Sequence, residues 1–227
     1  MKLSQLNPIN VEEEKEKFFA DPQSYNPQFS YATEIDPEYL TRYGKPSEPL
    51  ISQATDILQD TYRGKTESDI YQSQGEIIAA EKAETIIREY LIENNLGKRF
   101  KISWSNSVVS RTTISTDTIL LKKPSTYREH GILGMLHHEV GTHALRRINY
   151  EKQHWYGKKE KFGFSPYLIT EEGLAVLHSL LDLPEKKAFK SALRYLAVDI
   201  AQQGSFIDVW NFLEPYVTNT RRRWSIS

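Results

Sequence analysis

The sequence predicts an α+β fold that is mainly helical, with a small antiparallel sheet preceding a metal-binding helix. Helical periodicity covers most of the chain, whereas residues 99–122 change to an alternating, β-branched pattern. Five of the six histidines then fall between positions 130 and 154, where the helical pattern has returned. Helices, a short sheet and a histidine-bearing helical half, in that order, are typical of the α+β class.

Composition excludes several kinds of protein. The 227 residues include 29 basic and 30 acidic side chains, so the overall charge indicates neither a nucleic-acid nor a membrane partner. No cysteine is present, which rules out disulfides and thiolate metal ligands. The N-terminus turns acidic where a signal peptide needs an apolar core, and no apolar run is long enough to span a membrane. We therefore expect a cytoplasmic protein; its oligomeric state is left open.

The first half of the chain predicts helices and an irregular arm. Residues 11–20 suit a short helix capped by Asn10, and residues 21–46 are rich in Pro, Tyr, Asn and Asp. A helix is expected from Ser47-Glu48-Pro49 to about Arg63, and a longer one over residues 68–95. We expect residues 1–46 to form a helix and arm packed on the main body of the chain at 47–227, within a single domain overall.

Three alternating segments, 99–104, 108–113 and 118–122, predict the antiparallel sheet. Helical periodicity resumes over 127–148. Ser165-Pro166 is then typical of an N-cap and first helical position, opening a helix to about Asp182. Further helices are expected from Pro184 to about Gln203 and over 205–217.

The stretch LHHEVGTHALR (Leu136–Arg146) resembles the zinc-protease signature H-E-x-x-H but holds one extra residue between its histidines. In a regular α-helix, His143 lies roughly 140° around the axis from His138, so one ion cannot bind both. A π-type turn, with its i→i+5 hydrogen bond, brings positions five apart into register. Gly141 lies inside this interval, where the missing Cβ eases the distortion.

A simpler interpretation is that Glu139 and His143, four apart, form an ordinary surface pair. A second stretch favours the metal site. Residues 169–175, ITEEGLA, place two carboxylates on an otherwise apolar helix about thirty residues downstream, where His₂Glu zinc enzymes supply their third ligand. By themselves these glutamates would be an exposed pair, but the two stretches together offer a three-ligand set.

HEVGTHALR followed by EEGLA resembles the microtubule-associated tyrosine carboxypeptidases (MATCAP) and their bacterial relatives, which are named for a QEGLA motif. INVEEEKEKFF and YNPQFSY are similar to the N-terminal segments of that family, so the resemblance covers nearly the whole chain. It implies a zincin-like fold of the gluzincin type. Family members generally continue beyond the arginine-rich segment 219–224, so we expect either a C-terminally shortened member or a part of a longer protein.

The resemblance also implies roles for single residues. His138 and His143 would bind one zinc ion, Glu172 would be the third ligand, and Glu139 would be the general base. Glu171 stands where the family motif has Gln and receives no metal role. In this interpretation Glu139 accepts a proton from the zinc-activated water and passes it to the leaving amine. Known members remove a C-terminal tyrosine, notably from α-tubulin.

A carboxypeptidase must also bind a terminal carboxylate, which suits an arginine. Arg146, three residues after His143, is one candidate; Arg111 and the run 221–223 are the others, although a terminal run is more often a solvated tail. An extended peptide could pair with a strand edge at 108–113 or 118–122, unless these are ordinary core strands.

The favoured hypothesis is a zinc carboxypeptidase whose substrate is a peptide or protein C-terminus. An endopeptidase or aminopeptidase with the same metal site is a second possibility within enzymes. A regulatory or binding protein with a vestigial or structural zinc site is the alternative of a different class. Manganese, iron or cobalt could occupy similar ligands.

Overall fold

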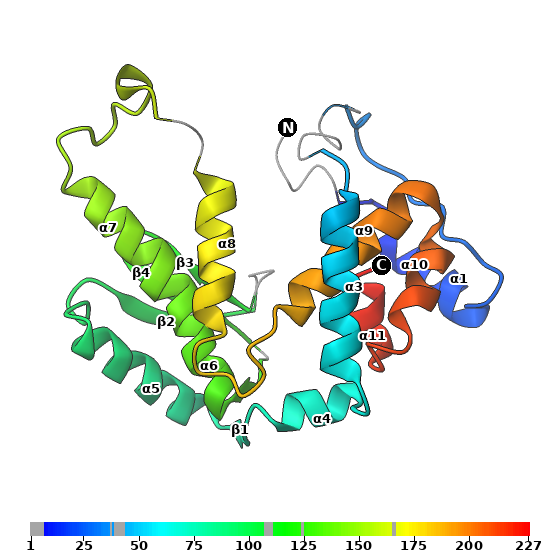
Figure 1. Cartoon of the computed structure of the whole chain (residues 1–227), viewed down its shortest axis with the longest axis horizontal. Helices are drawn as coiled ribbons and strands as arrows, with labels where there is room; N and C mark the ends of the chain where they lie inside the picture. The colour runs from blue at the N-terminus through cyan, green and yellow to red at the C-terminus, as the bar shows by residue number, and fades with distance from the viewer. Residues whose placement is uncertain (1–6, 37, 39–43, 107–110, 124, 165–166) are drawn as a thin grey trace. The chain divides into compact units, whose positions relative to one another are not determined.

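The structure is a computed structural model that describes residues 7–36, 38, 44–106, 111–123, 125–164 and 167–227 (Figure 1). The chain divides into two compact units. The first combines Met1–Glu67 with Phe189–Ser227 and is called the terminal unit. The second is Ser68–Ala188 and is called the central unit. This division does not follow the expected boundary at 46/47, and the single-domain expectation stays a prediction. None of the helices in the described residues is both long and apolar enough to cross a membrane.

The terminal unit is helical. Its elements are α1 (Val11–Ala20), α3 (Glu48–Tyr62), α9 (Phe189–Gln203), α10 (Phe206–Leu213) and α11 (Thr220–Trp224). The helices expected at 11–20 and 48–63 are confirmed. The helix expected from Pro184 begins only at Phe189, and the one expected over 205–217 ends at Leu213. After Leu213 the chain turns, and α11 follows with the Asn219 side chain accepting a hydrogen bond from the Arg222 N–H.

An aromatic cluster joins the two ends of the chain inside the terminal unit. Phe18 of α1 is fully buried, and its ring lies 5.2 Å from Phe206 and 4.8 Å from Trp210 on α10. Phe29 in the irregular arm contacts Phe206 and Trp224 at 5.9 and 6.1 Å. Edge-to-face rings at these distances stabilise beyond the area they bury. The arm is therefore held by packing as well as by hydrogen bonds.

Glu14 on α1 is a buried carboxylate that ties the arm to the helix. It accepts hydrogen bonds from the Tyr25 hydroxyl and the Gln28 backbone N–H, both at 2.6 Å, and pairs with Lys17 at 2.9 Å. Asn10 does not cap α1 with its side chain; it bonds Gln28 and Ser30 instead. The hydrogen bond from Tyr25, then that from Gln28, lowers the pKa of Glu14 from 4.5 to about 2.

The central unit carries the sheet and the histidine-bearing helices. Its elements are α4 (Glu67–Gln72, at the boundary), β1 (Ile77–Ile78), α5 (Ala80–Glu93), β2 (Lys101–Ser105), β3 (Thr112–Ile114), β4 (Thr118–Lys122), β5 (Tyr127–Arg128), α6 (Glu129–Leu136), η2 (His137–Ala144), α7 (Leu145–Glu151), η3 (Glu160–Phe162) and α8 (Leu168–Ser179). Ser165 and Pro166 lie outside the described residues, but α8 begins at Leu168 with Tyr167 as its N-cap, so the expected cap at Ser165 and first helical position at Pro166 were wrong.

The single helix expected over 68–95 was wrong. The chain breaks between α4 and α5, where Gly75 has a φ of +87° and β1 pairs antiparallel with β5. A positive φ is open to glycine at little cost and cannot continue an α-helix. The apolar residues Ile77 and Ile78 fit a helical periodicity and a short strand equally well.

The three-stranded sheet is mixed, with order β2-β4-β3. The expected antiparallel pairing holds for β3 with β4, but β2 runs parallel to β4. The separate antiparallel pair of β1 with β5 was not expected. Alternation along a strand indicates which side chains share a face, but not which strand lies beside it. Of the expected strand at 108–113, residues 108–110 lie outside the described residues, and β3 begins at Thr112.

The core of the central unit depends on the long helix α6-η2-α7. Five buried side chains recur at every fourth position: Ile132, Leu136, Val140, Ala144 and Ile148. In a regular α-helix, four such steps would turn the last side chain about 160° away from the first. The middle of this helix, His137–Ala144, is instead a π-helix, whose wider turns remove much of that drift. The predicted π-type turn is thus confirmed, and it also keeps the core residues on one face.

We expect Glu14→Gln to lower the melting temperature at neutral pH. The pKa of Glu14 is lower in the folded protein than the ordinary 4.5, so its charge favours folding above that pH. This contribution is lost as the pH falls from about 4.5 to about 2. Thermal unfolding across this range should show a weaker pH dependence in Glu14→Gln than in the exposed control Glu16→Gln. Equal pH dependence in both variants would contradict the assignment.

Candidate active site

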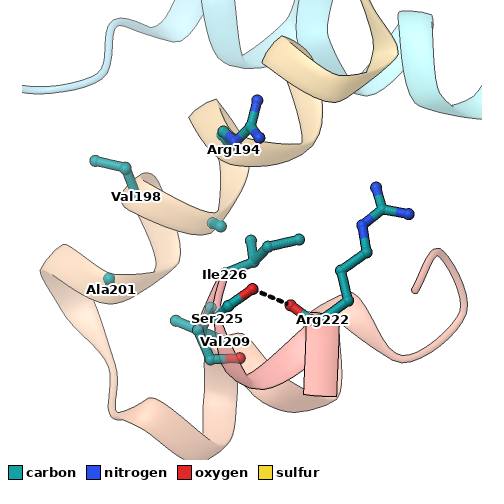
Figure 2. Close-up of a pocket in the computed structure, with 9 residues that line it drawn as sticks. Arg194, Val198, Ala201, Val209, Arg222, Ser225 and Ile226 are labelled. Carbon is teal, nitrogen blue, oxygen red and sulfur yellow. Dashed lines mark hydrogen bonds between the residues drawn. The ribbon is translucent and has the colours of Figure 1, made fainter. Parts of the chain in front are cut away.

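Among the cavities that the described residues form, two are compared, and one of them holds the chemically versatile side chains. The first, of about 400 Å³, lies in the terminal unit between α9, α10 and the C-terminal residues (Figure 2). Its described lining is apolar and hydroxyl-bearing apart from Arg194 and Arg222, with no histidine or carboxylate side chain. The second, of about 410 Å³, lies in the central unit and is lined by Thr112, Thr113, Ile114, His138, Glu139, His143, Arg146, Arg147 and Glu172. It is the candidate active site.

Three potential metal ligands converge in this cavity. One nitrogen each from His138 and His143 on η2, and one oxygen from Glu172 on α8, all lie within 4.8 Å of one another. Glu172 Oε2 is 4.0 Å from His138 Nε2, and Glu172 Oε1 is 3.7 Å from His143 Nε2. The structure thus brings together the residues of the sequence-based ligand set.

The backbone explains how histidines five positions apart meet. The Leu145 N–H donates to the Val140 carbonyl, an i→i+5 hydrogen bond of the π type. The Thr142 hydroxyl donates to the His137 carbonyl at 3.0 Å, again across five positions. The two imidazole centroids are 5.0 Å apart as a result.

Close backbone contact brings α8 to this helix. A Cβ on Gly134 of α6 would lie 2.4 Å from the Ser179 carbonyl oxygen at the end of α8, so only glycine fits there. Along the same interface, the Thr142 hydroxyl lies 2.8 Å from His178 Nδ1. These contacts fix the position of α8, and with it the position of Glu172.

A second histidine network supports the outer side of η2. His137 bonds the Tyr90 hydroxyl through Nδ1 at 3.0 Å and Asp182 through Nε2 at 2.6 Å. A Cβ on Gly141 would lie 3.1 Å from that hydroxyl. The φ of Gly141 is not positive, so its backbone conformation does not itself require glycine. The missing Cβ leaves space beside the Tyr90 hydroxyl, and it also makes the backbone easier to deform.

Burial shapes the electrostatics of the cavity. It raises the pKa of Glu139 from 4.5 to about 7; His143 opposes this shift and Glu172 adds to it. Burial also lowers the pKa of His138, and the neighbouring His143 lowers it further. A carboxyl group with a pKa near neutrality can both take up and release a proton at neutral pH. His138 is favoured in its neutral form, the form that binds metals.

Sequence comparisons agree with this geometry. A family model described as Microtubule-associated tyrosine carboxypeptidase (MATCAP) matches residues 40–227. The chain belongs to the MATCAP family. The MATCAP2 protein of Mus musculus is 31% identical, over 98% of this chain and 44% of its own length. Microtubule-associated tyrosine carboxypeptidase 1 of Rattus norvegicus and of Homo sapiens are each 30% identical, over 96% of this chain and 48% of their own lengths.

The resemblance drawn from HEVGTHALR and EEGLA is thereby confirmed. The chain spans a little less than half the length of these MATCAP relatives. The zincin-like fold, the bound zinc, the residue roles, a cytoplasmic location, and the absence of nucleic-acid and membrane partners stay predictions.

Sequence reasoning assigned no role to Glu171, the residue at the Gln position of the MATCAP motif. It is only 7% exposed, and its Oε1 accepts a hydrogen bond from His143 Nδ1 at 2.8 Å. The same oxygen lies 2.6 Å from Arg146 Nε. The signal in the sequence that could have identified Glu171 was a second carboxylate beside Glu172 on an otherwise apolar helix.

The arginines considered as binding residues for a terminal carboxylate lie in different surroundings. Arg146 lines the cavity, and its guanidinium lies 4.4 Å from the Tyr167 ring centroid. Arg111 is exposed beside Tyr127 and does not line the cavity. The run 221–223 is partly structural, since Arg222 pairs with Glu67 and Arg223 is buried over Trp210. Arg147, which sequence reasoning did not select, also lines the cavity and donates to the Ser115 carbonyl.

Of the two strands considered as peptide-binding edges, β4 is paired on both sides and cannot serve. β3 stands at the end of the strand order among the described strands, and its three residues line the cavity. The idea that a peptide lies along β3 stays a prediction.

We expect Gly141→Ala to destabilise the central unit. The added Cβ would press on the Tyr90 hydroxyl, which His137 holds in place, and such overpacking costs about 1–3 kcal/mol. This exceeds the roughly 1 kcal/mol that alanine gains over glycine in a helix. In a Tyr90→Phe background the obstructing oxygen is gone and the same substitution should cost less. Urea unfolding of the four proteins measures this coupling; strictly additive effects would contradict the steric explanation.

Proposed function

We propose that this chain is a zinc-dependent metallopeptidase of the carboxypeptidase type, with His138, His143 and Glu172 as the zinc ligands. The observation that carries the proposal is the convergence of these three donors in one cavity, on elements distant in sequence. Family membership supports a carboxypeptidase, because the relatives are named tyrosine carboxypeptidases.

The donor set fits zinc. Zinc binds histidine nitrogens and carboxylate oxygens at about 2.0–2.2 Å, so tetrahedral ligands lie about 3.4 Å apart. The nitrogen–oxygen distances of 3.7 and 4.0 Å are about 0.3 and 0.6 Å longer than that spacing, and all three donor atoms lie within 4.8 Å of one another. When bound at such a site, zinc lowers the pKa of a water molecule towards neutrality and polarises a carbonyl group.

The surroundings favour a catalytic over a structural site. Structural zinc sites are closed by four protein ligands, whereas catalytic sites have three and an open position. Within the described residues, the cluster has three members. It faces a cavity of about 410 Å³, large enough for the end of a peptide.

Glu139 is the proposed general base. It follows the first ligand histidine on η2 and lines the same cavity, where its carboxylate can accept a proton from the attacking water. The protonated carboxyl group then donates that proton to the leaving amine.

Arg146 is the proposed receptor for the terminal carboxylate of the substrate. A guanidinium group binds a carboxylate through two parallel hydrogen bonds, and Arg146 lines the cavity that the ligands face. The names of the relatives support tyrosine as the residue removed.

We expect Glu139→Gln to keep the metal and lose peptidase activity by about 10²–10⁴-fold, because the amide cannot accept the proton. Metal content by mass spectrometry and cleavage of tyrosine-ended peptides test the two parts separately. Glu89→Gln, which alters an exposed glutamate on α5, is the matched control and should retain activity. Full activity in Glu139→Gln would rule out this base.

A peptide panel distinguishes the type of peptidase. Peptides with a free C-terminus should lose one residue, whereas the same peptides with an amidated C-terminus should resist cleavage, because Arg146 then lacks its partner. Arg146→Ala should raise KM for free peptides by about 10-fold or more, the effect of losing one charged hydrogen bond of 1.5–3 kcal/mol. Equal cleavage of free and amidated peptides would indicate an endopeptidase or aminopeptidase instead.

A further inference from the structure

Glu171 is a buried carboxylate to which the proposed mechanism gives no task. It lies in the first turn of α8, one residue before the proposed ligand Glu172, and is 7% exposed. Burying a carboxylate costs several kcal/mol unless it is paired and hydrogen-bonded. Its two partners therefore indicate what it does.

The first partner is His143. Glu171 Oε1 lies 2.8 Å from His143 Nδ1, whereas Nε2 of the same ring lies on the side of Glu172, 3.7 Å from its Oε1. A carboxylate only accepts hydrogen bonds, so Nδ1 carries the hydrogen and donates it. Nε2 then keeps its lone pair for a metal ion. Glu171 thus selects the tautomer and fixes the orientation of this imidazole.

The second partner is Arg146. Its Nε lies 2.6 Å from the same Oε1, and its guanidinium lies 4.4 Å from the centroid of the Tyr167 ring. The contact with Oε1 is an ion pair without a hydrogen bond from Nε, and together the two contacts hold the guanidinium between Glu171 and the Tyr167 ring. Arg146 also lines the candidate active site. One carboxylate oxygen therefore holds a proposed metal ligand and the proposed substrate-binding arginine at the same time.

We propose that Glu171 is a positioning residue that aligns His143 for the metal and Arg146 for the substrate carboxylate through one shared oxygen atom. The inference rests on the proposed function and adds a coupling between its two parts. A glutamine at this position could still accept the hydrogen bond from His143 Nδ1, but only as a neutral group. Arg146 would then lose its ion pair, and His143 its charge-assisted partner.

The role of Glu171 in aligning His143 can be tested by metal affinity, which does not require peptidase activity. Competition with a chelator should show zinc and cobalt binding weakened about 10–100-fold in Glu171→Leu, the usual effect of losing such a supporting partner. Glu171→Gln should weaken it less, because the amide oxygen can still accept the Nδ1 hydrogen. The d–d spectrum of bound cobalt should change in the same order, and circular dichroism checks that each variant is folded.

Asp182→Asn is the matched control. This substitution alters another histidine–carboxylate pair, in which Asp182 bonds His137. His137 lies on η2, as His143 does, but the proposal does not include this pair. It should leave metal affinity unchanged. Equal weakening by Asp182→Asn and Glu171→Leu would overturn the proposal, since the effect would then reflect general loss of support. Complete loss of metal in Glu171→Leu together with retention in Glu172→Ala would make Glu171 a ligand and overturn it as well.

The role of Glu171 in aligning Arg146 is tested by KM and by the Arg146 Nε–H signal in ¹H–¹⁵N spectra. Glu171→Gln should raise KM for free-C-terminus peptides several-fold and shift that signal, and Arg146→Lys should raise KM with unchanged metal affinity. An unshifted Nε–H signal in Glu171→Gln would contradict the proposal. If the wild type binds metal but cleaves no peptide, the proposed function fails, and metal affinity with the Nε–H signal still decides the role of Glu171.

Discussion

The wide turn of η2 is the constraint on which the site and its core depend. Apolar residues spaced by four would spiral away from the core in a regular α-helix, and histidines spaced by five would point apart. The π-helix satisfies both sets together: Val140 and Ala144 stay buried while His138 and His143 face the cavity. Restoring a regular helix would therefore lose core packing as well as the cluster, so the core itself stabilises the unusual backbone.

Helix α8 supplies the carboxylates that approach the histidines of η2, and its two adjacent glutamates face different surroundings. Neighbouring positions on an α-helix are about 100° apart, so one glutamate can face the cavity while the other enters the interface between helices. Glu172 is about half exposed and approaches both imidazoles, whereas Glu171 is buried against His143 and Arg146. The contact of Gly134 with Ser179 fixes this arrangement at the far end of α8.

The π-type turn and the meeting of two histidines with a downstream glutamate could be predicted from spacing, whereas the choice of Glu172 over Glu171 as the proposed ligand came from the family resemblance. Two histidines five apart demand a particular local backbone, and a distant glutamate supplies the one missing donor. The break at Gly75, the parallel pairing of β2 and the contacts of Glu171 could not be predicted in the same way. A positive φ, a neighbouring strand and a partner across helices are properties of tertiary packing, on which local periodicity carries no information. Arg111 and Arg146 were equivalent in residue type, and only the fold separates them.

The three glutamates of the site show how surroundings divide tasks among identical side chains. Glu139 is partly buried, and this burial, with a smaller contribution from Glu172, raises its pKa to about 7, so it can exchange a proton at neutral pH. Glu171 is also buried but lies beside Arg146 and His143, and its oxygen is committed to holding them. Glu172 is open to the cavity and keeps its oxygens towards the imidazoles, as the proposed metal ligand must. The proposed proton carrier, support and ligand thus share one residue type and differ because the helices place each at a different depth.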